Sequence, residues 1–205
     1  MSSIVETLHR GNFMRRMFIS ICMGFLILGG ITGAAAQQKP NREEVLARLQ
    51  GKLRTVRHMA FHPVIVRAVR TQNNQHLSLD VIKQRDEQWR SAQEENSLQR
   101  SISQSQASQV LKTFVQRNPD FNEAFATDDQ GANVAMYPTT SDYWQGDEDK
   151  WIKSFNNGDG KMYIGEVELD ESTSTLAVQV SVPILDQGKT IGVLVIGVTQ
   201  KYLEE

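Results

Sequence analysis

One pair of histidines has a spacing that could bind a metal ion. His58 and His62 lie four residues apart, so both fall on the same face of a helix, as in zinc hydrolases. Met59 stands where those enzymes carry their general base, and Pro63 closes the helical turn. We therefore expect two surface or half-buried histidines rather than a catalytic zinc site.

A second segment partly matches a calcium-binding EF-hand loop. Asn157, Asp159, Gly160 and Glu166 match its third, fifth, sixth and twelfth positions. The first position is Phe155, which offers no oxygen to calcium. A hairpin turn is the better interpretation. We expect neither a metal ion nor a cofactor.

The residue combinations of common hydrolases are also missing from the sequence. Cys22 is the only cysteine, so internal disulfides and zinc sites built from paired thiolates are excluded. The sequence has no Gly-x-Ser-x-Gly elbow, and its spacing suggests no Ser-His-Asp or Cys-His set. We therefore expect a protein that is not an enzyme.

The strongest candidate for small-molecule chemistry is a loop over residues 137–155. The chain has 3 Trp, 4 Tyr and 8 Phe, and four of these rings gather at the start of this loop: Tyr137, Tyr143, Trp144 and Trp151. Aromatic walls with a few fixed polar groups are typical of small-ligand pockets. The alternative is that the rings anchor the loop to the sheet, and we expect at least one ring to have only that structural role.

Acidic residues cluster beside Trp151 in the same loop. Asp147, Glu148 and Asp149 precede it, and Lys150 is the one cation among them. Such a negative local field favours a cationic or neutral ligand over a dicarboxylate. The alternative is that these acidic side chains stabilise the first turn of a short helix through its dipole and point to solvent.

The overall charge of the chain is close to neutral. Its 205 residues include 22 Lys and Arg against 24 Asp and Glu, and the formal net charge is −2. Because binding to phosphate backbones needs clustered basic residues, we expect no nucleic-acid partner.

The N-terminus has the order of a secretory signal peptide. Arg10, Arg15 and Arg16 precede an apolar run over residues 17–31, which is followed by small residues up to Ala36. We predict that residues 1–36 are a signal peptide and that the protein is periplasmic or secreted. The alternative is an uncleaved N-terminal segment that tethers the protein to the inner membrane, because the apolar stretch approaches the roughly 20 residues that span a bilayer.

The rest of the chain predicts a helical part, residues 37–120, followed by a sheet part, residues 121–205. Apolar residues at helical spacing indicate helices that start near residues 41, 63, 78 and 110, whereas the polar residues 91–108 predict a solvated loop or an exposed helical turn. Strands are expected at 121–127, 132–137, 162–169, 177–182 and 191–198, with a short helix over 147–155. This order predicts an α+β fold with a five-stranded antiparallel sheet and a long N-terminal helix packed on one face.

A spaced set of segments carries a resemblance to a known family. These segments are residues 140–148 with Trp151, and residues 163–167, 170–172, 180–184 and 191–194. Together they resemble the single-module Cache domains, also called PDC sensor domains, which are PAS-like and work outside the cell. The resemblance covers residues 41–202 and is looser in the helical part. It implies a PAS-like sheet and a small-ligand pocket roofed by residues 137–155, with Tyr163 among the candidate ligand-binding residues.

The resemblance also suggests roles for individual residues. In related amino-acid-sensing modules, an arginine two residues before the tryptophan binds the ligand carboxylate, and a later aspartate binds its amine. Trp151 matches that tryptophan and Asp170 that aspartate, whereas Asp149 stands at the position of the arginine. The bidentate carboxylate clamp is therefore missing, and Lys150 offers only a point charge next to it.

Receptors that contain this module usually continue into a transmembrane helix and a cytoplasmic output region. This sequence stops at Glu205, so we expect a sensor-like domain without an output module in cis, which signals to a separate membrane sensor kinase or receptor. The alternative is an exported structural or interaction protein with a collapsed pocket, which acts through its N-terminal helix as a homodimer.

Overall fold

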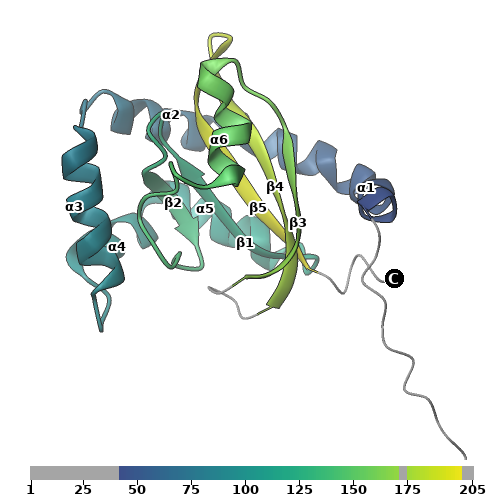
Figure 1. The fold of residues 1–205 in the computed structure, drawn as a ribbon, viewed down its shortest axis with the longest axis horizontal. Helices are drawn as coiled ribbons and strands as arrows, with labels where there is room; N and C mark the ends of the chain where they lie inside the picture. Colours follow the sequence, from purple (N-terminus) through teal and green to yellow (C-terminus); the bar gives the residue numbers. More distant parts are fainter. Residues whose placement is uncertain (1–41, 171–174, 200–205) are drawn as a thin grey trace, which may run out of the picture. The chain divides into compact units, whose positions relative to one another are not determined.

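The helices of the chain precede most of its strands (Figure 1). The computed structural model describes residues 42–170 and 175–199, so the predicted signal segment lies outside the described residues. The helical part holds α1 (Arg42–Ala60), α2 (Pro63–Asn73), α3 (Leu79–Arg90), α4 (Ser97–Ser103) and α5 (Gln106–Gln116). The sheet part holds β1 (Phe121–Thr127), β2 (Asn133–Tyr137), α6 (Asp149–Phe155), a 3₁₀ turn (Asn156–Gly158), β3 (Tyr163–Asp170), β4 (Thr175–Asp186) and β5 (Lys189–Thr199).

The five strands form one antiparallel sheet in the order β2-β1-β5-β4-β3. β5 occupies the centre between β1 and β4, and its residues from Gly192 to Val198 are all buried. Its continuous apolar run fits this position, because a central strand is covered on both faces. The predicted PAS-like α+β fold is confirmed.

Each face of the sheet has its own hydrophobic core. Strand alternation directs Leu194 and Ile196 to one face, where they join the core formed with α1, α2 and α5. Val193 and Val195 join a second core on the other face, formed with α3, α4 and the segment that includes α6. In Figure 1, α6 lies in front of the sheet and α1 and α2 lie behind it. The long N-terminal helix therefore packs on one face, as predicted.

The breaks between the first helices follow the sequence signals. α1 ends at Ala60, and Pro63 is the first residue of α2, where its missing N–H costs no hydrogen bond. His62 is the N-cap of α2, and its Nδ1 accepts a hydrogen bond of 3.3 Å from the amide of Val64. Ser78 caps α3 in the predicted way. No helix among the described residues is both long enough and apolar enough to cross a bilayer.

The polar segment between α3 and α5, predicted as a solvated loop or an exposed helical turn, is helical over part of its length. It contains α4, which starts with a capping box: Asn96 Oδ1 accepts from the Gln99 amide at 2.9 Å, and Gln99 Oε1 accepts from the Asn96 amide at 2.7 Å. Gln99 and Ile102 are buried. A segment rich in Ser and Gln therefore forms a helix here, because its polar side chains cap that helix and a few of its residues pack inward.

The segment that partly matches an EF-hand loop was predicted to be a hairpin turn, and the structure differs. Asn156 and Asn157 both adopt left-handed backbone conformations, with φ of 50° and 54°. The segment connects helix α6 to strand β3, so it is a helix-to-strand turn rather than a hairpin.

We predict that Gly192→Ala destabilises the fold at the centre of the sheet. A Cβ at this position would lie 2.1 Å from the carbonyl oxygen of Thr127 and 3.0 Å from Val69 Cγ1. We expect a loss of about 2 kcal/mol in the free energy of unfolding, measured by urea denaturation. The control is Gly165→Ala in β3, where the nearest atom would lie at 3.5 Å and the change should stay within about 0.5 kcal/mol. Equal losses in the two variants would contradict this prediction.

Candidate ligand-binding site

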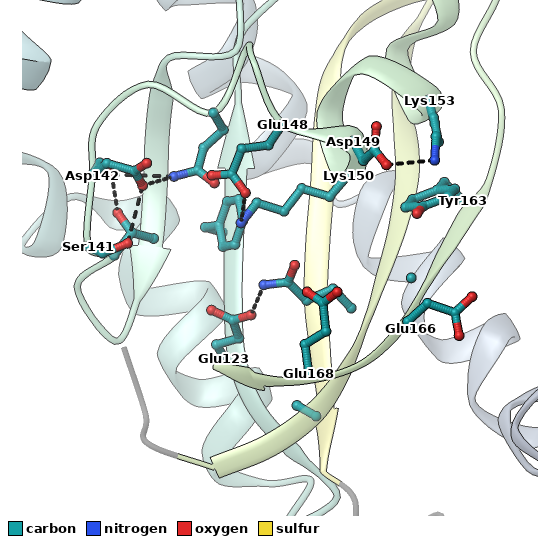
Figure 2. A pocket seen from close by; sticks show the side chains of 16 residues that line it. Glu123, Ser141, Asp142, Glu148, Asp149, Lys150, Lys153, Tyr163, Glu166 and Glu168 are labelled. Atoms are coloured by element: carbon teal, nitrogen blue, oxygen red, sulfur yellow. Dashed lines mark hydrogen bonds and ion pairs between the residues drawn. The ribbon is translucent and has the colours of Figure 1, made fainter. Parts of the chain in front are cut away.

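A cavity of about 590 Å³ lies between the sheet and the loop that leads into α6 (Figure 2). Its position is the one that the family resemblance implies, and its volume is within the roughly 300–1,000 Å³ of small-ligand sites. The sheet side is formed by residues of β1, β3 and β4: Glu123, Phe125, Tyr163, Gly165, Glu166, Glu168, Ala177 and Gln179. The loop side is formed by Thr140, Ser141, Asp142, Gln145, Glu148, Asp149, Lys150 and Lys153.

The loop is attached to α3 through one buried carboxylate. Asp86 is 6% exposed, and its Oδ1 accepts hydrogen bonds from the backbone amides of Tyr143 at 2.9 Å and Trp144 at 3.0 Å. Its Oδ2 forms an ion pair of 3.0 Å with Arg90. A carboxylate that accepts two backbone N–H groups fixes both the position and the direction of the loop.

A second attachment joins the loop to β2. Asn133 Nδ2 donates to Thr140 Oγ1 at 2.8 Å and to the carbonyl of Asp142 at 3.0 Å. The indole N–H of Trp89 donates to the carbonyl of Thr140 at 2.9 Å. The loop backbone is therefore held by side chains from two elements, which places Thr140, Ser141 and Asp142 at the edge of the cavity.

Three of the four aromatic candidates pack in the second core, beside the cavity. Tyr143 is fully buried, with its ring 5.6 Å from that of Trp89, and burial raises the pKa of its hydroxyl. Trp151 stacks on Phe155 at 4.8 Å. Both Trp144 and Trp151 donate their indole N–H to the turn between β1 and β2, to carbonyls at 2.8 Å and 3.4 Å. The cavity lining contains none of these three rings, which anchor the loop. A direct role in binding stays a prediction for them.

The remaining predicted site residues lie in three different places. Lys150 and Tyr163 line the cavity. Tyr137 packs against the other core, where its hydroxyl accepts a hydrogen bond of 3.4 Å from Gln116. Asp170 is the last residue of β3, and its side chain lies outside the described part of the structure. Its predicted role therefore stays a prediction.

Carboxylates outnumber ammonium groups in the cavity lining. Lys150 and Lys153 face six acidic residues: Glu123, Asp142, Glu148, Asp149, Glu166 and Glu168. Asp147, the remaining acid of the predicted cluster, is exposed. Within the described residues, no group of three or more His, Cys, Asp or Glu is arranged to hold a metal ion. The cavity is therefore acidic, with its carboxylates spread over both walls.

Both lysines are already paired with a carboxylate. Lys150 Nζ lies 2.9 Å from Glu148 Oε2 and 5.4 Å from the centre of the Phe125 ring. Lys153 Nζ lies 2.6 Å from Asp149 Oδ2. The exposed fractions of the two lysine side chains are 15% and 50%, so the Lys150 pair is the more buried of the two.

Asp142 is an unusual carboxylate of the site. Burial, assisted by the nearby negative charge of Glu148, raises its pKa to about 6, while Lys150 acts in the opposite direction. Its Oδ1 accepts a hydrogen bond from Gln145 Nε2, and Asp86 raises the pKa further. The protonation of this group therefore changes just below neutral pH.

Sequence reasoning missed the polar residues on the sheet side of the cavity. Glu123 is 3% exposed, and its Oε1 accepts a hydrogen bond of 2.7 Å from Gln179 Nε2. The sequence carries a signal for Glu123, because this charged residue lies inside a strand that is otherwise mostly apolar, and a buried glutamate normally needs a partner. Its partner on β4 could not be identified before the strand order was known.

The turn between β1 and β2 contains a second carboxylate with a raised pKa. Asp128 Oδ1 accepts hydrogen bonds from the amides of Gln130 at 2.9 Å and Ala132 at 2.8 Å. Burial raises its pKa to about 6 in spite of these bonds. It belongs to the turn and does not line the cavity.

Comparison with known proteins finds similarity only among solved structures. No family model matches the chain, and no curated protein matches it. The Escherichia coli DcuS sensor domain is 18% identical, with 78% of this chain and 95% of that chain covered and a TM-score of 0.48. The sensory domain of the Campylobacter jejuni chemoreceptor Tlp3 with isoleucine bound is 12% identical, with 80% and 65% covered and a TM-score of 0.39.

A third similar structure is the ligand-binding domain of the Pseudomonas aeruginosa amino-acid chemoreceptor PctC in complex with GABA. It is 15% identical, with 71% of this chain and 62% of that chain covered and a TM-score of 0.36. The chain thus spans nearly all of the DcuS domain but less than two thirds of the two chemoreceptor domains. The three structures are a sensor domain, a sensory domain and a ligand-binding domain.

We predict that Trp151→Ala weakens the attachment of the loop. It removes the stack on Phe155 and the hydrogen bond to the β1–β2 turn, so the free energy of unfolding should fall by about 2 kcal/mol, less than for a fully buried tryptophan. Trp151→Phe retains a ring for the stack and should lose about 1 kcal/mol or less. Urea denaturation measures both losses. Lost ligand binding at unchanged stability would instead show that the ring contacts the ligand.

Proposed function

We propose that this protein is an extracytoplasmic sensor-type domain that binds a cationic or neutral small molecule. The observation that carries the proposal is the cavity of about 590 Å³, in which six carboxylates surround two lysines. A positively charged group would gain favourable interactions with this lining, whereas a dicarboxylate would meet like charges.

The pairing of the two lysines strengthens the preference against anions. An anion needs a free cation or a bidentate arginine, and the cavity lining contains no arginine. Lys150 and Lys153 are each within 3 Å of a carboxylate, at 2.9 Å and 2.6 Å. A ligand carboxylate would have to break one of these pairs and leave an acidic residue without its partner.

The proposal includes export and signalling. Residues 1–36 have the order of a signal peptide, and this segment supports a periplasmic or secreted location. We propose that ligand binding is passed to a membrane sensor kinase or receptor; the similar solved structures include sensor and chemoreceptor domains.

The alternative, an interaction protein that acts through its N-terminal helix, has one observation in its favour. A groove of about 480 Å³ between the end of α1 and α5 is lined by Met59, Val110 and Phe114 among others. Phe61, which follows α1, is 56% exposed. That alternative requires a collapsed pocket, however, and the cavity on the other face of the sheet is open.

The ligand prediction is tested by calorimetric titration of the purified protein with matched sets of amines, neutral molecules and organic acids of equal size. We expect binding of amines or neutral molecules, because the lining is acidic. A ligand at 100 times its Kd should also raise the free energy of unfolding by about 2.7 kcal/mol. Tight binding confined to the organic acids would contradict the charge preference, and no binding in any set would favour the interaction protein.

We predict that the affinity for a cationic ligand falls when the pH is lowered through about 6. Asp142 has its pKa raised to about 6, so it is ionised at pH 7.5 and mostly protonated at pH 5. A bound cation favours the ionised form of Asp142, so protonation of Asp142 competes with binding. We expect the affinity at pH 5 to be about tenfold lower than at pH 7.5. Calorimetry at the two pH values measures this loss.

The control for the pH prediction is Asp142→Asn. Asp128 also has a pKa of about 6, but it lies in the β1–β2 turn. If Asp142 is responsible, Asp142→Asn binds the cation more weakly at pH 7.5 and with little dependence on pH. A pH dependence that persists in this variant would assign the effect to another group.

A further inference from the structure

We infer that the ammonium group of Lys150 is a built-in competitor, which occupies a subsite that the ammonium group of a ligand takes over on binding. The inference rests on the proposed small-molecule function and specifies it. The ligand is an amine with a primary ammonium group, and binding moves Lys150 away from Glu148.

The first evidence is the environment of Lys150. Its side chain is 15% exposed, its Nζ lies 2.9 Å from Glu148 Oε2, and the same Nζ lies 5.4 Å from the centre of the Phe125 ring. A carboxylate and an aromatic face are the two groups that recognise ammonium ions in proteins. Figure 2 shows the Lys150 side chain extending from α6 to meet Glu148 within the cavity.

The second evidence is a buried acceptor without a donor. Gln145 lines the same cavity and is 1% exposed, and its Oε1 has no hydrogen-bond partner among the described residues. Its Nε2 donates to Asp142, so the amide oxygen is the atom left over. A buried acceptor without a donor is unfavourable, and an ammonium group has three N–H donors. A residue of the cavity lining therefore has an acceptor for which the described residues supply no donor.

Lys153, the other lysine of the cavity lining on α6, has the same kinds of neighbours as Lys150 but is more exposed. Lys153 Nζ also has a carboxylate, Asp149 Oδ2 at 2.6 Å, and an aromatic ring, Tyr163 at 4.9 Å. Its side chain is 50% exposed and that of Asp149 is 67% exposed, however, so this is a surface pair screened by water. The two lysines form a matched pair for experiment.

A tethered competitor sets a requirement for the ligand. The ammonium group of Lys150 is tethered beside Glu148, so its effective concentration there is far above that of a dilute free amine. A simple amine at lower concentration cannot displace it, whereas an amine that also contacts the rest of the cavity can. Glu123 and Gln179 on the sheet provide polar groups for such contacts. Lys150 would therefore make the site selective for larger amines.

The test removes the tethered ammonium group and supplies a free one. Lys150→Ala deletes the three carbons and the nitrogen beyond Cβ, which correspond to n-propylammonium. We expect this variant to bind n-propylammonium at least about tenfold more tightly than the unaltered protein in calorimetric titration, because the subsite is no longer occupied. The neutral isostere n-propanol should show no such gain, since the recognition is of charge.

Matched variants assign the gain to the subsite. Lys153→Ala should increase n-propylammonium binding much less than Lys150→Ala, because the Lys153–Asp149 pair is exposed to water. Glu148→Gln combined with Lys150→Ala should abolish the gain. Thermal unfolding checks that each variant is folded. If Lys150→Ala does not fold, Lys150→Met retains the packed side-chain stem, and the matching probe is then the ammonium ion, with the same expected gain.

Two results would overturn the inference. One is an absence of gain in folded Lys150→Ala or Lys150→Met, or an equal gain in Lys153→Ala. The other is that a cationic metabolite bound by the unaltered protein is no longer bound by Lys150→Ala, which would show that Lys150 contacts the ligand directly. If the unaltered protein binds amines in either case, the proposed function stands; it fails when no small molecule binds or when only organic acids bind.

Discussion

A buried carboxylate holds the loop over the cavity to the helical part of the protein. Asp86 on α3 accepts the backbone amides of Tyr143 and Trp144, and this contact fixes a segment that has no regular secondary structure. Two indole N–H groups then hold the same loop to the β1–β2 turn. Because these contacts lie at the side of the cavity, the loop spans the sheet without filling the space beneath it. The aromatic rings thus create the cavity by anchoring its edge, while polar residues form its surface.

The acidic lining has an energetic consequence for the empty site. Carboxylates that share a cavity repel one another, and burial increases this cost, as the raised pKa of Asp142 shows. The protein offsets part of it internally, through the Lys150–Glu148 pair and the hydrogen bond from Gln179 to Glu123. A cation that enters the cavity would offset more of it, so the same charges that destabilise the empty site favour binding of an amine.

The sequence predicts the fold better than the site for a physical reason. Strand and helix periods are local, so β5 and the break at Pro63 could be predicted from neighbouring residues alone. Residues 91–108 left a solvated loop and an exposed helical turn both open, because the Asn96–Gln99 capping box of α4 is made of polar residues in a polar segment. The site combines residues of β1, β3 and β4 with a distant loop, and only the strand order brings Glu123 next to Gln179. Lys150 and Tyr163 were predicted through the charge pattern and the family resemblance, and both line the cavity.

Helix α6 lacks the usual side-chain cap at its N-terminus, which lies beside the cavity. Glu148 is its N-cap residue, yet its side chain makes no capping hydrogen bond, and its carboxylate pairs instead with Lys150. A helix of seven residues has little stability of its own, so a missing cap matters more here than in a long helix. If a ligand ammonium group took over Glu148, or if Glu148 were released to cap the helix, the start of α6 would respond directly. In either case, the stability of the element that covers the cavity would depend on what the cavity contains.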